Sequence, residues 1–208
     1  APAPAPAQDG GEHVYAVSLG EDLIAQFHLA DADLTPLDPP VAAAPDGSGP
    51  RHLVIDGDNG YAMTEFSGEA IRFVRGPDGT LTPAEAVDVV IPIAGLEHST
   101  LGADPTRAPL IWGADVHRAG AYLLTSERNS SQLTVTGVSE GGRLGPVLGY
   151  TPTEAVPRGF GVSPDGAFVV AVGEASTHAQ LLRLGDDGRL EQVDRVGIGR
   201  GANWVRFV

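Results

Sequence analysis

The sequence predicts an all-β protein with the architecture of a β-propeller. Three observations lead to this prediction: four copies of one strand-and-turn pattern, short apolar runs bounded by Gly, Pro and Asp turns, and no stretch with helical periodicity. Each copy contains a small turn that leads into a leucine, and these marker leucines lie 47, 63 and 46 residues apart. They are Leu34, Leu81, Leu144 and Leu190. Such a period, built from short strands, is typical of propeller blades, each a four-stranded sheet beside a central channel.

The strands of a blade are called A to D here, from the channel outward. The expected B strands are His13–Ser18, Tyr61–Thr64, Ala121–Thr125 and Phe168–Val172. The expected C strands are Leu23–Leu29, Ala70–Val74, Gln132–Val138 and Ala179–Leu184. Three A strands are expected at Arg51–Ile55, Leu110–Val116 and Arg158–Val162. Pro-Asp-Gly turns such as the one at 76–79 supply the fixed and positive φ angles that tight turns need.

The order of strands also predicts how the chain is organised. Residues 1–10 are rich in Ala and Pro and are expected to be extended, whereas 11–208 are expected to form one domain of propeller blades. The blades begin at a B strand, so Ala202–Val208 is expected to be an A strand that clasps the ring, with an ordinary edge strand as the alternative. An insertion over 95–109 explains the long repeat. Trp112 and Trp204 are expected in the core between blades.

Composition excludes several classes of function. The net charge is −14, and all 13 basic residues are Arg, which argues against nucleic acid and anionic membranes as partners. The absence of Cys excludes disulfides, thiolate metal sites and a Cys nucleophile, but it does not fix the compartment. No apolar run approaches the roughly 18 residues of a membrane span. A cytoplasmic location is favoured, with secretion as the alternative.

Charged side chains fall at equivalent places when the repeats are put in register. Arg51 and Arg158 lie at the start of A strands, while Arg128 and Glu174 lie in the loops that follow B strands. Glu65 falls in the same loop of its own blade. These positions face one end of the channel, so arginines and carboxylates are expected to converge there. Arginine suits carboxylate or phosphate, and a neighbouring carboxylate can act as a general base. The cluster favours a small anionic substrate; the alternative is a set of salt bridges that hold the ring together.

Four segments give the chain a family resemblance. They are Gly49-Pro50-Arg51-His52-Leu53, Tyr61-Ala62-Met63-Thr64-Glu65, Tyr122-Leu123-Leu124-Thr125-Ser126-Glu127-Arg128-Asn129 and Pro157-Arg158-Gly159-Phe160-Gly161-Val162-Ser163-Pro164-Asp165-Gly166. In this order they resemble the lactonase family of seven-bladed β-propellers, which includes propeller-type 6-phosphogluconolactonases and 3-carboxymuconate cyclases. The resemblance runs from about residue 11 to 208 and implies four blades' worth of a seven-bladed ring, its C-terminal portion. It implies a complementary N-terminal fragment or a second copy of the chain as partner; a closed four-bladed ring is the other possibility.

The resemblance also implies roles for particular residues. Arg51 and Arg128 are expected to bind the anion and stabilise an oxyanion or enolate, and Glu65 is expected to do acid–base work. Substrate binding is assigned to His52, Arg158 and Glu174, with a structural role as the alternative for His52. The family's catalytic His maps near Ala3, where this chain has none.

These residues predict a lactonase-like propeller that acts on a small anionic lactone. No metal and no cofactor is expected, because His98, His117 and His178 show no ligand spacing. A fold can host many functions, so the alternative is a non-catalytic propeller that serves as a binding or interaction scaffold.

Overall fold

The structure, a computed structural model, describes residues 12–208 as a succession of four antiparallel sheets. The first sheet has three strands, β1 (Glu12–Ser18), β2 (Leu23–Ala30) and β3 (Asp33–Ala43). The second has four strands, β4 (Pro50–Asp56), β5 (Asn59–Thr64), β6 (Glu69–Arg75) and β7 (Leu81–Asp88). The third consists of β8 (Gly113–Ala119), β9 (Tyr122–Glu127), β10 (Gln132–Val138) and β11 (Leu144–Pro152). The fourth consists of β12 (Phe160–Val162), β13 (Phe168–Val172), β14 (His178–Leu184) and β15 (Leu190–Gly197).

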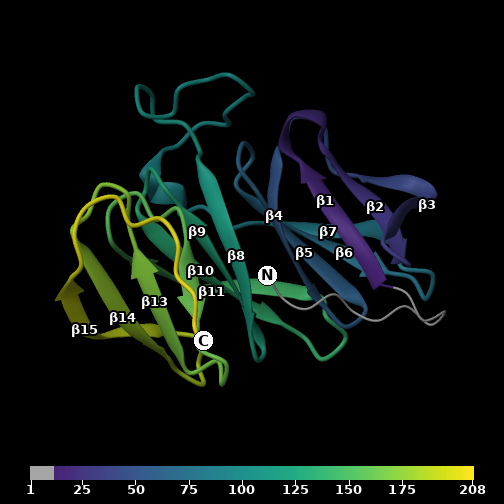
Figure 1. Cartoon of the computed structure of the whole chain (residues 1–208). Helices are drawn as coiled ribbons and strands as arrows, with labels where there is room; N and C mark the ends of the chain where they lie inside the picture. Colours follow the sequence, from purple (N-terminus) through teal and green to yellow (C-terminus); the bar gives the residue numbers. More distant parts are fainter. Residues whose placement is uncertain (1–11) are drawn as a thin grey trace.

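Each sheet is a simple meander in which strands pair in chain order. Figure 1 shows the sheets following one another as a fan, from β1–β3 on the right to β12–β15 on the left. The first strands of the last three sheets contact one another, β4 against β8 and β8 against β12. These strands therefore form the inner side of the array, as strand A does in a propeller. The predicted all-β fold with four blades' worth of sheet is confirmed.

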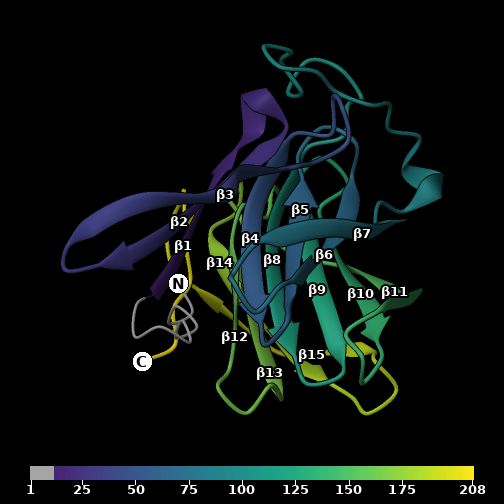
Figure 2. The same ribbon diagram turned by 90° about the vertical axis from the view of Figure 1, so that its right-hand side faces the viewer.

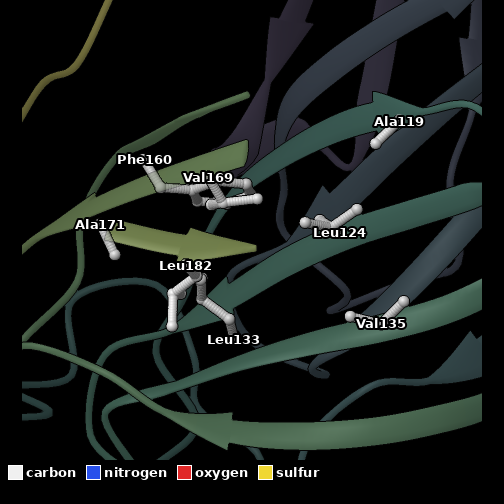
Figure 3. Packing of buried hydrophobic residues seen from close by; sticks show 8 residues of the cluster. All are labelled: Ala119, Leu124, Leu133, Val135, Phe160, Val169, Ala171 and Leu182. Atoms are coloured by element: carbon white, nitrogen blue, oxygen red, sulfur yellow. The ribbon is translucent and has the colours of Figure 1, made fainter. Parts of the chain in front are cut away.

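The core lies between successive sheets. Between the third and fourth sheets, Leu124, Leu133, Phe160, Val169 and Leu182 are almost fully buried and pack together (Figure 3). Side chains alternate along a strand, so each blade presents apolar residues to both neighbouring blades. Burying one such side chain stabilises a fold by roughly 1.5–3 kcal/mol.

Tyrosine hydroxyls join adjacent blades. The tyrosines lie in β1, β5 and β9, and each donates to a carbonyl in the outer hairpin turn of the next blade. The pairs are Tyr15 to Gly79 O at 2.5 Å, Tyr61 to Gly142 O at 2.6 Å and Tyr122 to Asp186 O at 2.5 Å. The fourth sheet has Phe168 at the start of β13, where β9 has Tyr122. The repeat seen in the sequence is thus also a repeat of inter-blade hydrogen bonds.

Three expectations about strands need correction. The strand expected from Leu110 begins at Gly113, and β12 begins at Phe160, so Arg158 lies just before its strand. The expected clasp strand at 202–208 is wrong, because this segment forms no strand ladder with the described residues. It lies against β12 instead: a Cβ on Gly161 of β12 would meet Cγ1 of Val205 at 2.8 Å. The segment therefore packs onto β12 without pairing with it.

Both tryptophans also differ from expectation. Trp204 is 61% exposed, which is incompatible with a core position, because the segment that carries it lies at the surface. Trp112 is half-buried, and its ring stacks under the Arg128 guanidinium.

The segment between β7 and β8 forms the expected insertion. It includes the short 3₁₀ helix η2 (Pro92–Ala94) and projects beyond the sheets at the top of Figures 1 and 2. The other short helix, η1 (Leu19–Glu21), joins β1 to β2. Within residues 12–208, no helix is long and apolar enough to cross a membrane. The extended segment expected at 1–10 lies outside the described residues.

Candidate functional site

Local backbone irregularities place two polar side chains at the start of the inner strands. The pairing of β4 with β5 shifts between Pro50 and His52, which leaves Arg51 on a bulge. The pairing of β8 with β9 shifts between Gly113 and Val116, which does the same for Asp115. A bulge turns a side chain away from the regular alternation of a strand and is common beside functional sites. The directions of the Arg51 and Asp115 side chains therefore depend on bulges, which a regular strand pattern in the sequence does not predict.

Arg51, Glu65 and Arg128 form one ionic cluster. Arg51 Nε lies 2.9 Å and Arg128 Nη2 lies 2.8 Å from the same oxygen, Oε2 of Glu65. Both guanidiniums are also held by the start of the third blade: Arg51 Nη1 donates to Ala114 O at 2.8 Å, and Arg128 Nη2 donates to Gly113 O at 3.1 Å. The sequence-based prediction that these three residues converge is correct in geometry; their roles in chemistry stay predictions.

Burial sets the electrostatics of this cluster. The Arg128 side chain is 4% exposed, and its guanidinium lies 3.8 Å from the ring centre of Trp112. Desolvation lowers the pKa of Arg128 to about 10, although the charge of Glu65 acts in the opposite direction. Desolvation likewise lowers the pKa of Arg51. With all three groups ionised, the cluster carries one net positive charge.

A cavity of about 170 Å³ opens beside this cluster. Its lining residues are Arg51, His52, Arg158, Asn203 and Trp204. The lining thus includes two arginines and no carboxylate, an arrangement that favours an anion. Glu65 and Arg128 lie behind Arg51 and do not line the cavity. Of the six predicted site residues, Arg51, His52 and Arg158 are the ones that reach it.

His52 is held by a carboxylate from the neighbouring blade. Its Nδ1 lies 2.7 Å from Oδ1 of Asp115, and His117 Nε2 lies 3.1 Å from the other oxygen, Oδ2. Oδ2 also accepts from the backbone N–H of Phe160 at 3.2 Å. Asp115 is 3% exposed. Its contacts join β4, β8 and β12 at one buried point.

The environment of Asp115 keeps it ionised. Burial acts to raise the pKa of this carboxyl, but hydrogen bonds from His117 and His52, together with their charges, outweigh burial and hold the pKa well below its usual range. Sequence reasoning missed Asp115. Its spacing from His117 gave no usable signal, because the bulge at Asp115 breaks the alternation along the strand and its partner His52 lies in another blade.

Arg158 and Glu174 form a pair at the edge of the site. Arg158 Nη1 lies 3.1 Å from Glu174 Oε1, and the Arg158 side chain is 47% exposed. Glu174 does not line the cavity of Arg51. It lines a second, larger cavity of about 380 Å³ with Ser176, Thr177, His178 and Arg195 among its other lining residues.

Glu127 is a second residue that sequence reasoning missed. It is 1% exposed, and its oxygens accept from the backbone N–H groups of Trp112 at 2.8 Å, Asn129 at 3.1 Å and Ser130 at 2.5 Å. These bonds fix the turn after β9, and Arg128 lies in that turn. Glu127 therefore positions Arg128 without touching the cavity.

Residues 12–208 contain no cluster of three or more His, Asp or Glu side chains arranged to hold a metal ion.

Solved structures support the fold. A putative 6-phosphogluconolactonase from Bacteroides fragilis superimposes with a TM-score of 0.80 and 25% identity, over 99% of this chain and 56% of that one. A periplasmic gluconolactonase from Pseudomonas aeruginosa superimposes with a TM-score of 0.78 over 96% of this chain and 54% of that one. At 24% identity, this second likeness concerns the fold alone.

Sequence comparisons agree. The chain is 30% identical to a 6-phosphogluconolactonase of Klebsiella pneumoniae over 90% of its own length, and 32% identical to one of Serratia proteamaculans over 91%. It spans 55–56% of the length of these two relatives. Residues 5–207 match the family model described as "Lactonase, 7-bladed beta-propeller". The chain therefore belongs to the lactonase family of seven-bladed β-propellers.

Proposed function

We propose that this protein hydrolyses a small anionic lactone of the 6-phosphogluconolactone type. The observation that carries the proposal is the cavity lined by Arg51 and Arg158, with the Arg51–Glu65–Arg128 cluster immediately behind it. Two cationic side chains beside a cavity attract a phosphate or carboxylate. The names of the relatives, 6-phosphogluconolactonase, favour a phosphorylated sugar lactone within this class.

In this proposal the cluster supplies binding and charge stabilisation. Arg51 touches the substrate and stabilises negative charge that develops on the lactone carbonyl oxygen, while Arg158 binds the anionic group. Glu65 holds the Arg51 guanidinium from behind, and Arg128 in turn holds Glu65. The acid–base role predicted for Glu65 is retained as a hypothesis, and Glu174 acts on the substrate through Arg158.

Replacing Arg51 by alanine tests the proposal. We expect kcat/KM for 6-phosphogluconolactone to fall about 10²–10³-fold, because one preorganised donor at a developing oxyanion contributes about this much. The measurement is proton release in weak buffer, corrected for spontaneous hydrolysis. Arg107→Ala is the matched control, since Arg107 lies in the insertion and its side chain is 85% exposed. Equal activity of Arg51→Ala and the control contradicts the proposed role of Arg51.

We further propose that the ring is completed by the remaining blades, carried on a complementary N-terminal segment or on a second copy of this chain. Two facts support this: the first sheet has three strands where the others have four, and the chain spans about half of its curated relatives. Native mass spectrometry of the purified protein is expected to show an assembly heavier than one 21.4 kDa chain. Denaturing mass measurement then distinguishes a second copy from a different polypeptide. A monomer of this one chain contradicts the proposal and favours a binding scaffold.

A further inference from the structure

The cavity beside the ionic cluster needs a proton acceptor if water is to attack a lactone there. Among the residues that line it, Arg51 and Arg158 are cationic, and the side chains of Asn203 and Trp204 are not basic. Glu65 lies behind Arg51 and already accepts from two guanidiniums. His52 is therefore the one lining side chain, among the described residues, whose ring nitrogen can act as a proton acceptor.

The partners of His52 define which ring nitrogen carries the hydrogen. Asp115 is ionised and so can only accept, which means that His52 Nδ1, 2.7 Å away, carries the proton. On the other side of the ring, Nε2 lies 3.3 Å from Arg51 Nη1, which can only donate. Both neighbours require the same neutral tautomer, with a hydrogen on Nδ1 and a lone pair on Nε2.

The ring is also fixed in orientation while it remains accessible. The His52 side chain is 31% exposed, whereas the Asp115 side chain is buried and is held by the backbone N–H groups of Val116 and Phe160. The Trp204 ring meets the imidazole edge-on, with ring centres 6.1 Å apart. A buried carboxylate that fixes a partly exposed imidazole is the arrangement that allows histidine to act as a base and then as an acid.

We propose that His52, oriented by Asp115, is the general base and acid of lactone hydrolysis in this protein; the proposal rests on the function proposed above. His52 Nε2 takes a proton from water as the water oxygen bonds to the lactone carbonyl carbon. The carbonyl π electrons move to oxygen, where Arg51 stabilises the charge. The oxyanion then reforms the carbonyl, the ring C–O bond breaks, and the departing oxygen receives the proton from His52. The product is the open-chain hydroxy acid, and its carboxyl loses a proton to solvent.

Charged groups lie near His52 on β4, on β8 and just before β12. Asp115 on β8 stabilises the imidazolium, and His117 lies on the far oxygen of Asp115. Arg51 on β4 and Arg158 before β12 oppose a positive charge on the ring, and each is paired with a carboxylate, Glu65 and Glu174 respectively. The 202–208 segment contributes the uncharged Trp204 ring.

The test compares His52→Gln with His98→Gln in the intact protein, in whatever assembly it is purified. With 6-phosphogluconolactone as probe, we expect His52→Gln to lower kcat at least about 10²-fold with little change in KM. The wild-type kcat/KM is expected to fall towards low pH, and this fall should be absent from the residual activity of the variant. His98 is exposed in the insertion, so its replacement is expected to leave activity unchanged.

Asp115 is a positioning residue in this scheme, and its test uses the tautomer of His52. Nitrogen-15 NMR of the imidazole is expected to show hydrogen on Nδ1 in the wild type and a changed tautomer population in Asp115→Asn, with a lower kcat. Wild-type kcat in His52→Gln, or hydrogen on Nε2 in the wild type, overturns the inference alone. A wild-type protein that hydrolyses no anionic lactone overturns the proposed function as well. The NMR result does not depend on the His52 variant folding.

Discussion

Replacing Glu65 by glutamine is expected to lower the free energy of unfolding by about 3–5 kcal/mol, the range for breaking a buried ion pair from one side. Glu65 Oε2 is the common acceptor of Arg51 and Arg128, whose side chains are 13% and 4% exposed. Glutamine keeps the shape of the side chain but removes the negative charge, so two neighbouring guanidiniums remain in a poorly solvated site. Urea unfolding, followed by circular dichroism, measures the change.

Two further variants separate the charge effect from loss of packing. Glu174→Gln removes the carboxylate that pairs with the half-exposed Arg158, and it is expected to cost no more than about 1 kcal/mol. Adding Arg128→Met to Glu65→Gln removes one of the uncompensated charges and is expected to restore part of the lost stability. Equal costs for Glu65→Gln and Glu174→Gln contradict the view that burial makes the central cluster different.

Replacing Gly113 by alanine is the other change with a large expected effect, a loss of about 3 kcal/mol. A Cβ at this position would lie 2.0 Å from the carbonyl oxygen of Thr64 and 2.6 Å from Cε of Met63. The Gly113 N–H also donates to Glu65 O at 3.1 Å, so the two blades are tied together here by their backbones. A methyl group must therefore force β8 away from the second blade, together with the carbonyls that hold Arg51 and Arg128. Thermal unfolding and lactone turnover should both report this.

Gly149 on β11 provides the matched control for Gly113→Ala. A Cβ at Gly149 would meet no heavy atom within 4 Å, so Gly149→Ala is expected to change stability by no more than about 0.5 kcal/mol. If Gly113→Ala is as stable as Gly149→Ala, the close approach between β8 and the second blade does not exist in solution.

Local apolar patterns were enough to predict most strands, because each blade alternates buried and exposed residues along short runs. The start of β8 was placed too early, at Leu110, because Leu110-Ile111-Trp112 continues the apolar run while its backbone belongs to the insertion. The 202–208 segment alternates like a strand, yet it packs against the glycines of β12 and joins no ladder. Alternation reports which side chains can be buried, not which backbone they pair with.

The candidate site was predicted in part for the same reason. Placing the repeats in register brought Arg51, Glu65 and Arg128 together, because equivalent residues of different blades face the same end of the channel. Asp115 could not be recognised in this way, since it lies on a bulge and its partner His52 is in another blade. A contact between two blades produces no characteristic residue spacing in the sequence. The His52–Asp115 pair could therefore be recognised only in the structure.

The central claim is that the cavity beside Arg51 and His52 hydrolyses an anionic lactone. The most direct test is the rate at which the intact wild-type protein hydrolyses 6-phosphogluconolactone. This rate is compared with the spontaneous rate and with the rate for unphosphorylated gluconolactone under the same conditions. The account predicts enzymatic hydrolysis that prefers the phosphorylated lactone, because Arg51 and Arg158 bind its charge. A rate no greater than the spontaneous one with either lactone, from protein shown to be folded, contradicts the account.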